Sequence, residues 1–149
     1  MTRQLSDGDY EQLLRFRTGL RRFLRWSEAA ATAAGLTPAQ HQLLLAIRGH
    51  AGRAGRAGRA EPTIGDVADA LLVRHHSAVG LVDRAEAAGL VRRHVDRDDA
   101  RVVRLTLTAA GSRRLANLTD AHLDELAMLS STLRPLWDVL TERGYLDDG

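Results

Sequence analysis

His75, His76 and Ser77 stand next to one another and offer the chemistry of a metal ligand set or of a nucleophilic pair. Adjacent residues on a helix point about 100° apart, however, and no carboxylate or third histidine follows at i+4. The chain also has no Gly-x-Ser-x-Gly turn of a serine hydrolase and no glycine-rich phosphate loop after a strand. We therefore expect no enzyme activity, no catalytic or metal site and no cofactor.

The second chemically informative group is a charged loop at residues 96–101, which contains Arg97 and Arg101. A guanidinium at the tip of a hairpin can reach a narrow minor groove of DNA, where the negative potential attracts it without a full base code. The loop indicates nucleic-acid binding, although an ordinary turn with solvated charges has the same composition.

Residues 63–108 contain the elements that would position these side chains. Thr63 is suited to cap a helix. Asp66 stands where a capping box has Glu or Gln, so this signal for a helix start is good rather than perfect. The apolar residues that follow at helical spacing are Ile64, Val67, Ala68 and Leu71. They predict a short amphipathic helix.

A second short helix is predicted after a turn at residues 72–74. Its apolar stripe consists of Ala78, Leu81, Val82 and Ala85. Gly89 can end it in the left-handed conformation. The opposite face carries small or hydrogen-bonding groups near the amino end, which is typical of a helix in the major groove. From this helix we predict DNA contacts by Arg74, His75, His76, Ser77 and Val79.

Two β-rich segments, residues 90–95 and 102–107, complete the pattern. In the second segment Val103, Leu105 and Leu107 alternate with Val102, Arg104 and Thr106, which predicts one buried face. Helix, helix and hairpin in this order form a winged helix-turn-helix, so the sequence indicates a protein that binds double-stranded DNA. Arg97, Asp99 and Arg101 would lie at the tip of its wing.

These residues resemble the multiple antibiotic resistance regulator (MarR) family. Four pieces stand in the family's order and spacing: Leu81–Val82–Asp83–Arg84, Gly89–Leu90–Val91 with Arg93, Asp99–Ala100–Arg101, and Leu107–Thr108 with Gly111. The ordered set is more specific than any one piece. The resemblance covers residues 36–115 clearly and the terminal helices more loosely. It implies a homodimeric transcription regulator, usually a repressor, that a small molecule releases from a pseudo-palindromic DNA operator. It also implies a wing in which Asp99 orients Arg101.

The chain departs from the family pattern at three places. Ala100 replaces one of the two arginines often found at the wing tip, and Val79–Gly80 stand where many members have Thr-Arg. Arg74 and His75 occupy the position of a Ser-Pro helix start, which leaves that start defined only to within a couple of residues. No operator sequence can therefore be carried over.

The predicted fold class is mainly α, of the α+β type, with a winged helix-turn-helix and long terminal dimerisation helices. We expect one domain over residues 1–149, with the DNA-binding core at 36–110 and helical dimerisation regions at 1–35 and 111–149. Long helices are predicted at 10–34 and 108–143, the second broken or kinked by Pro135, and another opens at Thr37–Pro38. The candidate residues of the dimer interface are Leu20, Phe23, Leu126 and Leu129.

Charge and composition agree with this organisation. All 21 basic residues are arginines, a usage typical of a GC-rich genome. Residues 48–104 carry eleven arginines against eight acids, whereas residues 105–149 carry four against seven, so the segment expected to face DNA is the basic one. The absence of cysteine excludes disulfides and thiolate zinc sites. No signal peptide or membrane span is visible, and we expect a cytoplasmic protein without membrane contact.

Two further expectations concern ligands and loops. The resemblance implies small aromatic or anionic effectors in a crevice bordered by the first two helices, where Trp26 and His41 are the candidate lining residues; packing roles for both stay open. Gly-Arg-Ala occurs three times within residues 51–60, which predicts either a solvated loop or one whose arginines contact phosphates. Two alternative functions also stay open: a winged-helix protein that binds other proteins, and a DNA-binding protein without a ligand.

Overall fold

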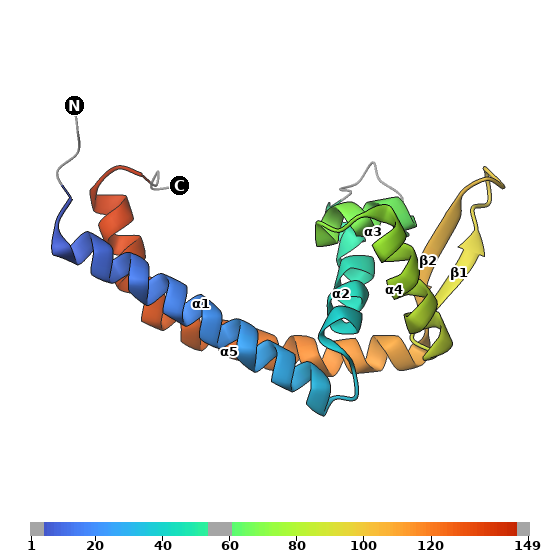
Figure 1. Ribbon diagram of the computed structural model, residues 1–149, viewed down its shortest axis with the longest axis horizontal. Helices are drawn as coiled ribbons and strands as arrows, with labels where there is room; N and C mark the ends of the chain where they lie inside the picture. The colour runs from blue at the N-terminus through green and yellow to red at the C-terminus, as the bar shows by residue number, and fades with distance from the viewer. Residues whose placement is uncertain (1–4, 54–60, 146–149) are drawn as a thin grey trace. The chain divides into compact units, whose positions relative to one another are not determined.

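The computed structural model describes residues 5–53 and 61–145, and its ribbon is shown in Figure 1. The elements follow in the order α1 (Asp7–Ala33), α2 (Pro38–Arg53), α3 (Ile64–Leu71), α4 (His75–Ala87), β1 (Val91–Val95), β2 (Val103–Leu107) and α5 (Ala109–Glu142). Over these described ranges, five helices and a two-stranded antiparallel sheet confirm the predicted mainly α fold class with a winged helix-turn-helix. None of the helices within the described ranges is long and apolar enough to cross a membrane.

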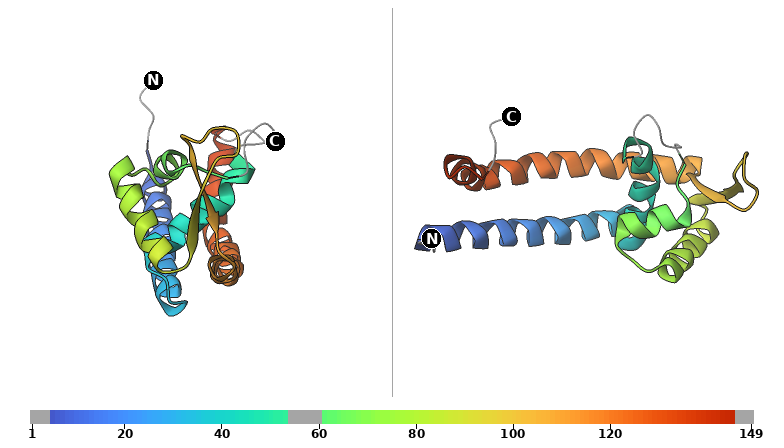
Figure 2. Two further views of the ribbon diagram at one scale, coloured as in Figure 1. Left: turned by 90° about the vertical axis from the view of Figure 1, so that its right-hand side faces the viewer. Right: turned by 90° about the horizontal axis from the view of Figure 1, so that it is seen from above.

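The chain divides into two compact units. We call Ala30–Thr119 the winged unit, and Met1–Ala29 together with Asp120–Gly149 the two-helix unit. Both views of Figure 2 show α2, α3, α4 and the hairpin gathered in the winged unit. The long helices α1 and α5 supply the two-helix unit with one antiparallel segment each.

The core of the winged unit is built from the apolar faces that the sequence predicts. All four predicted core residues of α4 are buried: Ala78, Leu81, Val82 and Ala85. Leu81, Val82 and Ala85 belong to one cluster with Leu43 and Leu44 of α2 and Leu105 of β2, and these three leucines are fully buried. Burial of a leucine side chain contributes about 1.5–3 kcal/mol, so this cluster is the main source of stability for the elements that carry the candidate site.

The amino end of α3 is capped by Thr63, as the sequence predicts. Thr63 Oγ1 accepts a hydrogen bond from the backbone amide of Asp66 at 3.2 Å, and the Asp66 carboxylate accepts from the backbone amide of Thr63 at 2.9 Å. The capping box is complete although Asp66 replaces the usual Glu or Gln, because the shorter aspartate also reaches the amide. Thr37 and Gln40 form the same reciprocal pair at the start of α2.

The helix-turn-helix bends sharply at Leu72, which adopts the left-handed conformation with φ 55° and leaves its side chain 92% exposed. α4 then begins at His75, with Arg74 in the N-cap position and no side-chain cap hydrogen bond. The missing cap agrees with the absence of serine at that position. Gly89 follows α4 with φ 71°, as predicted for a glycine that ends a helix.

The hairpin pairs Val91 with Leu107 and Val95 with Val103 at its two ends. Leu105 is fully buried, but Val103 is 38% exposed. The prediction that Val103 shares the buried face was therefore wrong, because the end of the hairpin nearest the loop extends beyond the core. The carbonyl of Pro62 accepts a hydrogen bond from the Leu105 amide at 2.9 Å, so the segment before α3 pairs with the outer edge of β2.

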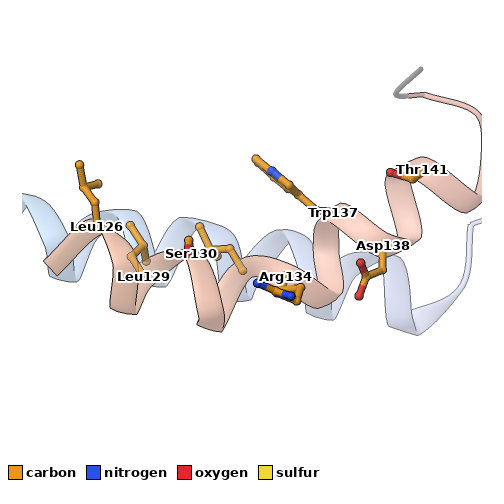
Figure 3. A pocket seen from close by; sticks show the side chains of 8 residues that line it. Leu126, Leu129, Ser130, Arg134, Trp137, Asp138 and Thr141 are labelled. Atoms are coloured by element: carbon orange, nitrogen blue, oxygen red, sulfur yellow. The ribbon is translucent and has the colours of Figure 1, made fainter. Parts of the chain in front are cut away.

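In the two-helix unit, aromatic side chains join α1 to α5. Phe16 stacks on Trp137, with ring centroids 6.3 Å apart. An ion pair joins Asp9 to Arg143 at 2.6 Å between Oδ1 and Nη1. Helix α5 continues through Pro135, so the chain does not break there as one alternative predicted; its axis instead changes direction between the labelled Arg134 and Trp137 (Figure 3).

The Gly-Arg-Ala segment was predicted as a loop over residues 51–60. Its first three residues belong to α2, which ends at Arg53, so the loop prediction was wrong for that part. Glycine in a helix costs only about 1 kcal/mol relative to alanine, so one glycine does not prevent a final turn of α2. Residues 54–60, with Arg56 and Arg59, lie outside the described residues.

Candidate nucleic-acid interface

The amino end of α4 presents the predicted contact residues on one exposed surface. Arg74, His75, His76 and Ser77 are all exposed, and Val79 is partly exposed. The first turn contains no acidic residue, so the positive end of the helix dipole is not neutralised from within. Imidazole, hydroxyl and backbone N–H groups at this end can donate to base edges or to phosphate oxygens.

Gly80 lies one turn further along α4, next to the Arg84 side chain. A Cβ added there would lie 3.3 Å from Nη1 of Arg84, which shows that the arginine extends back beside the glycine. Arg84 is exposed and adds a cation that our sequence analysis did not include among the contact residues. The i, i+4 spacing of Gly80 and Arg84 was the signal that could have identified it.

The wing carries the best-defined interaction of the site. Arg101 donates from Nε and Nη2 to the two carboxylate oxygens of Asp99, each at 3.0 Å, and its backbone amide donates to Oδ1 at the same distance. The side-chain hydrogen bonding to Asp99 raises the pKa of Arg101, while desolvation acts in the other direction. The Arg101 side chain is 90% exposed, so its remaining N–H groups face solvent. The predicted orientation of Arg101 by Asp99 is thus present, and its contact with DNA stays a prediction.

The root of the wing contains charged residues that our sequence analysis did not single out. Asp96 is buried and pairs with Arg104 at 2.8 Å. Glu61 and His94 also pair, at 2.6 Å between Oε2 and Nε2. Together with exposed Arg97 these residues line a hollow on one face of the hairpin. The alternation of β2, which places Arg104 opposite His94 on that face, was the available signal.

Arg93 connects the wing to α4. Its guanidinium donates to Glu86 at 2.8 Å and to Asp83 at 2.5 Å, and its backbone amide donates to Glu86 at 3.1 Å. Burial alone would lower the pKa of Arg93, but the hydrogen bonds to Asp83 and Glu86 raise it. The cation is thus permanently charged and holds the second helix of the motif against β1.

Trp26 and His41, the residues predicted to line an effector site, belong to different units. In the two-helix unit, the Trp26 ring stacks on Phe23 and meets the edge of His122 with centroids 4.8 Å apart. Ser27 Oγ lies 2.7 Å from Nε2 of His122. In the winged unit His41 is buried with 5% exposure. The effector role of each residue stays a prediction.

The candidate dimer residues all lie in the two-helix unit. Leu20 and Leu126 are each 41% exposed, whereas Phe23 and Leu129 are partly buried within the chain. Leu129 packs against Gly19, since a Cβ there would lie 3.0 Å from its Cδ1. A hollow of about 530 Å³ runs along α5 (Figure 3). It is lined by Leu126, Leu129, Ser130, Leu133, Arg134, Trp137, Asp138 and Thr141.

Within the described part of the chain, no group of three or more His, Cys, Asp or Glu side chains could hold a metal ion. His75 and His76 therefore lie at the site without a ligand set around them. Their exposure leaves both imidazoles available to an external partner.

A family model described as the MarR family matches residues 34–102. Over this segment the chain is similar to the MarR family. The matched segment contains α2, α3, α4, β1 and the wing tip with Arg101, so it includes both candidate contact surfaces. The match supports a DNA-binding transcriptional regulator.

Solved structures of MarR-family proteins share this fold. A mutant of MepR from S. aureus is 21% identical, with a TM-score of 0.69 over 86% of this chain and 92% of that one. Wild-type MarR from E. coli is 18% identical, with a TM-score of 0.65 over 95% and 99% of the two chains. Another MepR mutant, bound to an oligodeoxyribonucleotide, has a TM-score of 0.61 at 21% identity over 94% and 96%. No curated protein sequence matches the chain significantly.

Proposed function

We propose that this chain is a sequence-specific regulator that binds double-stranded DNA as a homodimer and represses transcription until a small aromatic or anionic molecule releases it. The observation that carries the proposal is the combination, in one winged unit, of an exposed, acid-free amino end of α4 and an exposed, oriented Arg101. The first suits base edges in a major groove, and the second suits the minor groove beside it.

The DNA component has support from a relative of the same fold. The MepR mutant noted above is bound to an oligodeoxyribonucleotide. In a homodimer, two copies of α4 would face a pseudo-palindrome whose half-sites lie roughly 10 base pairs apart, about one turn of the double helix. His76 and Ser77 are the best placed to sense sequence, because they are exposed near the amino end of α4.

Release by an effector requires only a modest energetic preference. A tenfold loss of operator affinity corresponds to about 1.4 kcal/mol of difference in ligand binding between the free and the DNA-bound protein. Trp26 offers an indole face and His41 an imidazole that can bind a carboxylate or phenolate. The family resemblance and these two chemistries support the proposal of an aromatic or anionic effector.

A gel-shift titration against the DNA upstream of the protein's own gene, with and without excess nonspecific DNA, tests the proposal. Arg101→Ala is expected to weaken binding to many sequences and to reduce the salt slope by roughly 1, because one phosphate-region cation is lost. His76→Ala and Ser77→Ala are expected to change sequence preference, by about 1–3 kcal/mol per lost base contact.

Arg25→Ala is the matched control for charge, since it removes an exposed arginine of the two-helix unit. Affinity and salt dependence that stay unchanged in Arg101→Ala, His76→Ala and Ser77→Ala would contradict the assignment of the interface. A wild-type protein that binds no duplex, but captures a protein partner through the same surface, would contradict the DNA-binding function.

A further inference from the structure

The root of the wing contains a buried carboxylate that orders the loop above it. Asp96 is 8% exposed although it begins the charged loop. Its Oδ1 accepts hydrogen bonds from the backbone amides of Asp98 at 2.9 Å and Asp99 at 3.0 Å. The Asp96 amide donates to the carbonyl of Val102 at 2.8 Å and closes the loop. The Asp96 side chain therefore fixes the loop backbone at Asp98 and Asp99.

Arg104 ties this carboxylate to the body of the winged unit. Its Nε donates to Oδ2 of Asp96 at 2.8 Å, and its Nη1 donates to the backbone carbonyl of Glu61 at 3.0 Å. The Arg104 side chain is only 15% exposed, and the next residue, Leu105, is fully buried in the core. A buried, charge-assisted pair of this kind is a rigid connection, because removal of either partner leaves an uncompensated charge.

We infer that Asp96 and Arg104 are positioning residues for the wing arginine: they connect the core of the winged unit, through Asp99, to the exposed guanidinium of Arg101. The inference rests on the proposed DNA-binding function and adds residues that need not touch DNA. Its physical basis is pre-organisation, since a side chain already held in its bound orientation loses less conformational freedom on binding.

This connection predicts a set of effects that loss of stability alone would not produce. In Asp96→Ala, Arg101 keeps its charge, but the loop backbone that positions it is no longer fixed. The affinity for DNA should therefore fall roughly 2- to 10-fold, while the salt slope stays as in the wild type. Asp96→Asn keeps an oxygen for the two loop amides and should recover part of the loss. In an Arg101→Ala background, Asp96→Ala should cause no further loss, because the residue that it positions is gone.

The experiment combines this mutant cycle with amide hydrogen exchange of the DNA-free protein. Protection of the Asp98 and Asp99 amides should be lost in Asp96→Ala and retained in part in Asp96→Asn. Asp124→Asn removes an exposed acid of the two-helix unit and controls for net charge. If Asp96→Ala lowers the thermal midpoint so far that the winged unit is not folded, Asp96→Asn and Arg104→Met provide the comparison.

The results distinguish the positioning role of Asp96 from the proposed DNA-binding function. Amide protection that does not change, affinity equal to that of Asp124→Asn, or an equal loss in the Arg101→Ala background would overturn the positioning role alone. A wild-type protein that binds no duplex DNA would overturn the proposed function, and with it the role of the wing in that function.

Discussion

Arg93 of β1 and Glu86 of α4 are joined by two hydrogen bonds, one from the arginine side chain at 2.8 Å and one from its backbone amide at 3.1 Å. The same guanidinium also reaches Asp83. The strand that leads into the wing and the helix that carries His75 and His76 are thus held in one fixed arrangement within the winged unit. Both candidate contact surfaces depend on that arrangement.

Arg93→Met should loosen α4 from the wing while it keeps most of the buried aliphatic contact. We expect a loss of about 1 kcal/mol in the free energy of unfolding, a small value because both carboxylate partners are more than a third exposed. Chemical denaturation measures it. Arg92→Met, on the neighbouring exposed position, is the control and should change stability by less than about 0.5 kcal/mol. Equal values for the two variants would contradict the role of Arg93 in holding α4 against β1.

Gly111→Ala should destabilise the winged unit strongly. The added Cβ would lie 2.2 Å from the backbone carbonyl oxygen of Leu90, and a backbone atom cannot move aside as a flexible side chain can. Overpacking of this kind costs about 1–3 kcal/mol. Gly49→Ala on α2 is the matched control, because nothing lies within 4 Å of its added Cβ. The free energy of unfolding of Gly49→Ala should rise by roughly 0.5–1 kcal/mol because alanine has the higher helix propensity. A loss of stability in this control would contradict the explanation by steric overlap at Gly111.

The capping box should make stability depend on acid pH. Burial raises the pKa of Asp66. Hydrogen bonds from Thr63 and the nearby His50 and Arg104 lower it by more than burial raises it, so the net shift is downward. A carboxyl group with a lowered folded-state pKa stabilises the protein above its unfolded pKa, about 3.9, and loses that contribution as pH falls through the folded value. The difference in unfolding free energy between wild type and Asp66→Ala should therefore shrink below about pH 4.

Asp69→Ala, which removes an exposed carboxylate from the same helix, controls for the change of charge. The predicted contribution of Asp66 is modest, because its side chain is 40% exposed and partly screened. Denaturation curves at several pH values between about 3 and 7 give the measurement. A wild-type advantage over Asp66→Ala that grows on acidification would show that the sign is wrong.

Leu126→Glu should shift a homodimer toward monomer. A charge at this exposed apolar position would have to be buried in an interface between copies, which is costly. Light scattering at micromolar concentration measures the mass, for which 16.3 kDa is the single chain. Leu45→Glu, at a similarly exposed position on α2, should leave the mass unchanged. A wild-type mass of one chain would count heavily against the dimer.

Trp26 should report effector binding by its fluorescence in a Trp137→Phe background, which leaves one indole in the chain. We expect a phenolic or carboxylate compound that changes this emission to weaken operator binding as well. His41→Ala should weaken that compound's effect on operator binding. If no compound binds, or if Trp26→Phe and His41→Ala bind the compound like the wild type, the predicted ligand residues are wrong.

Local sequence determined much of the architecture. The four apolar residues of α4, from Ala78 to Ala85, share one face at helical spacing, so their burial could be predicted without knowledge of any neighbour. Gly89 ends its helix in the left-handed conformation for an equally local reason. Asp99 and Arg101 are two residues apart, and their pairing needs only the loop between them.

Tertiary structure decided what depends on partners distant in the chain. Asp96 is followed within eight residues by Arg104, but the burial of that pair also requires Glu61, 43 residues from Arg104, to supply its carbonyl. Val103 has the alternation of a core residue, yet the core ends before it. Periodicity assigns a side chain to a face of its element, whereas the depth of the neighbouring packing sets whether that face is covered, and only the folded chain contains that information.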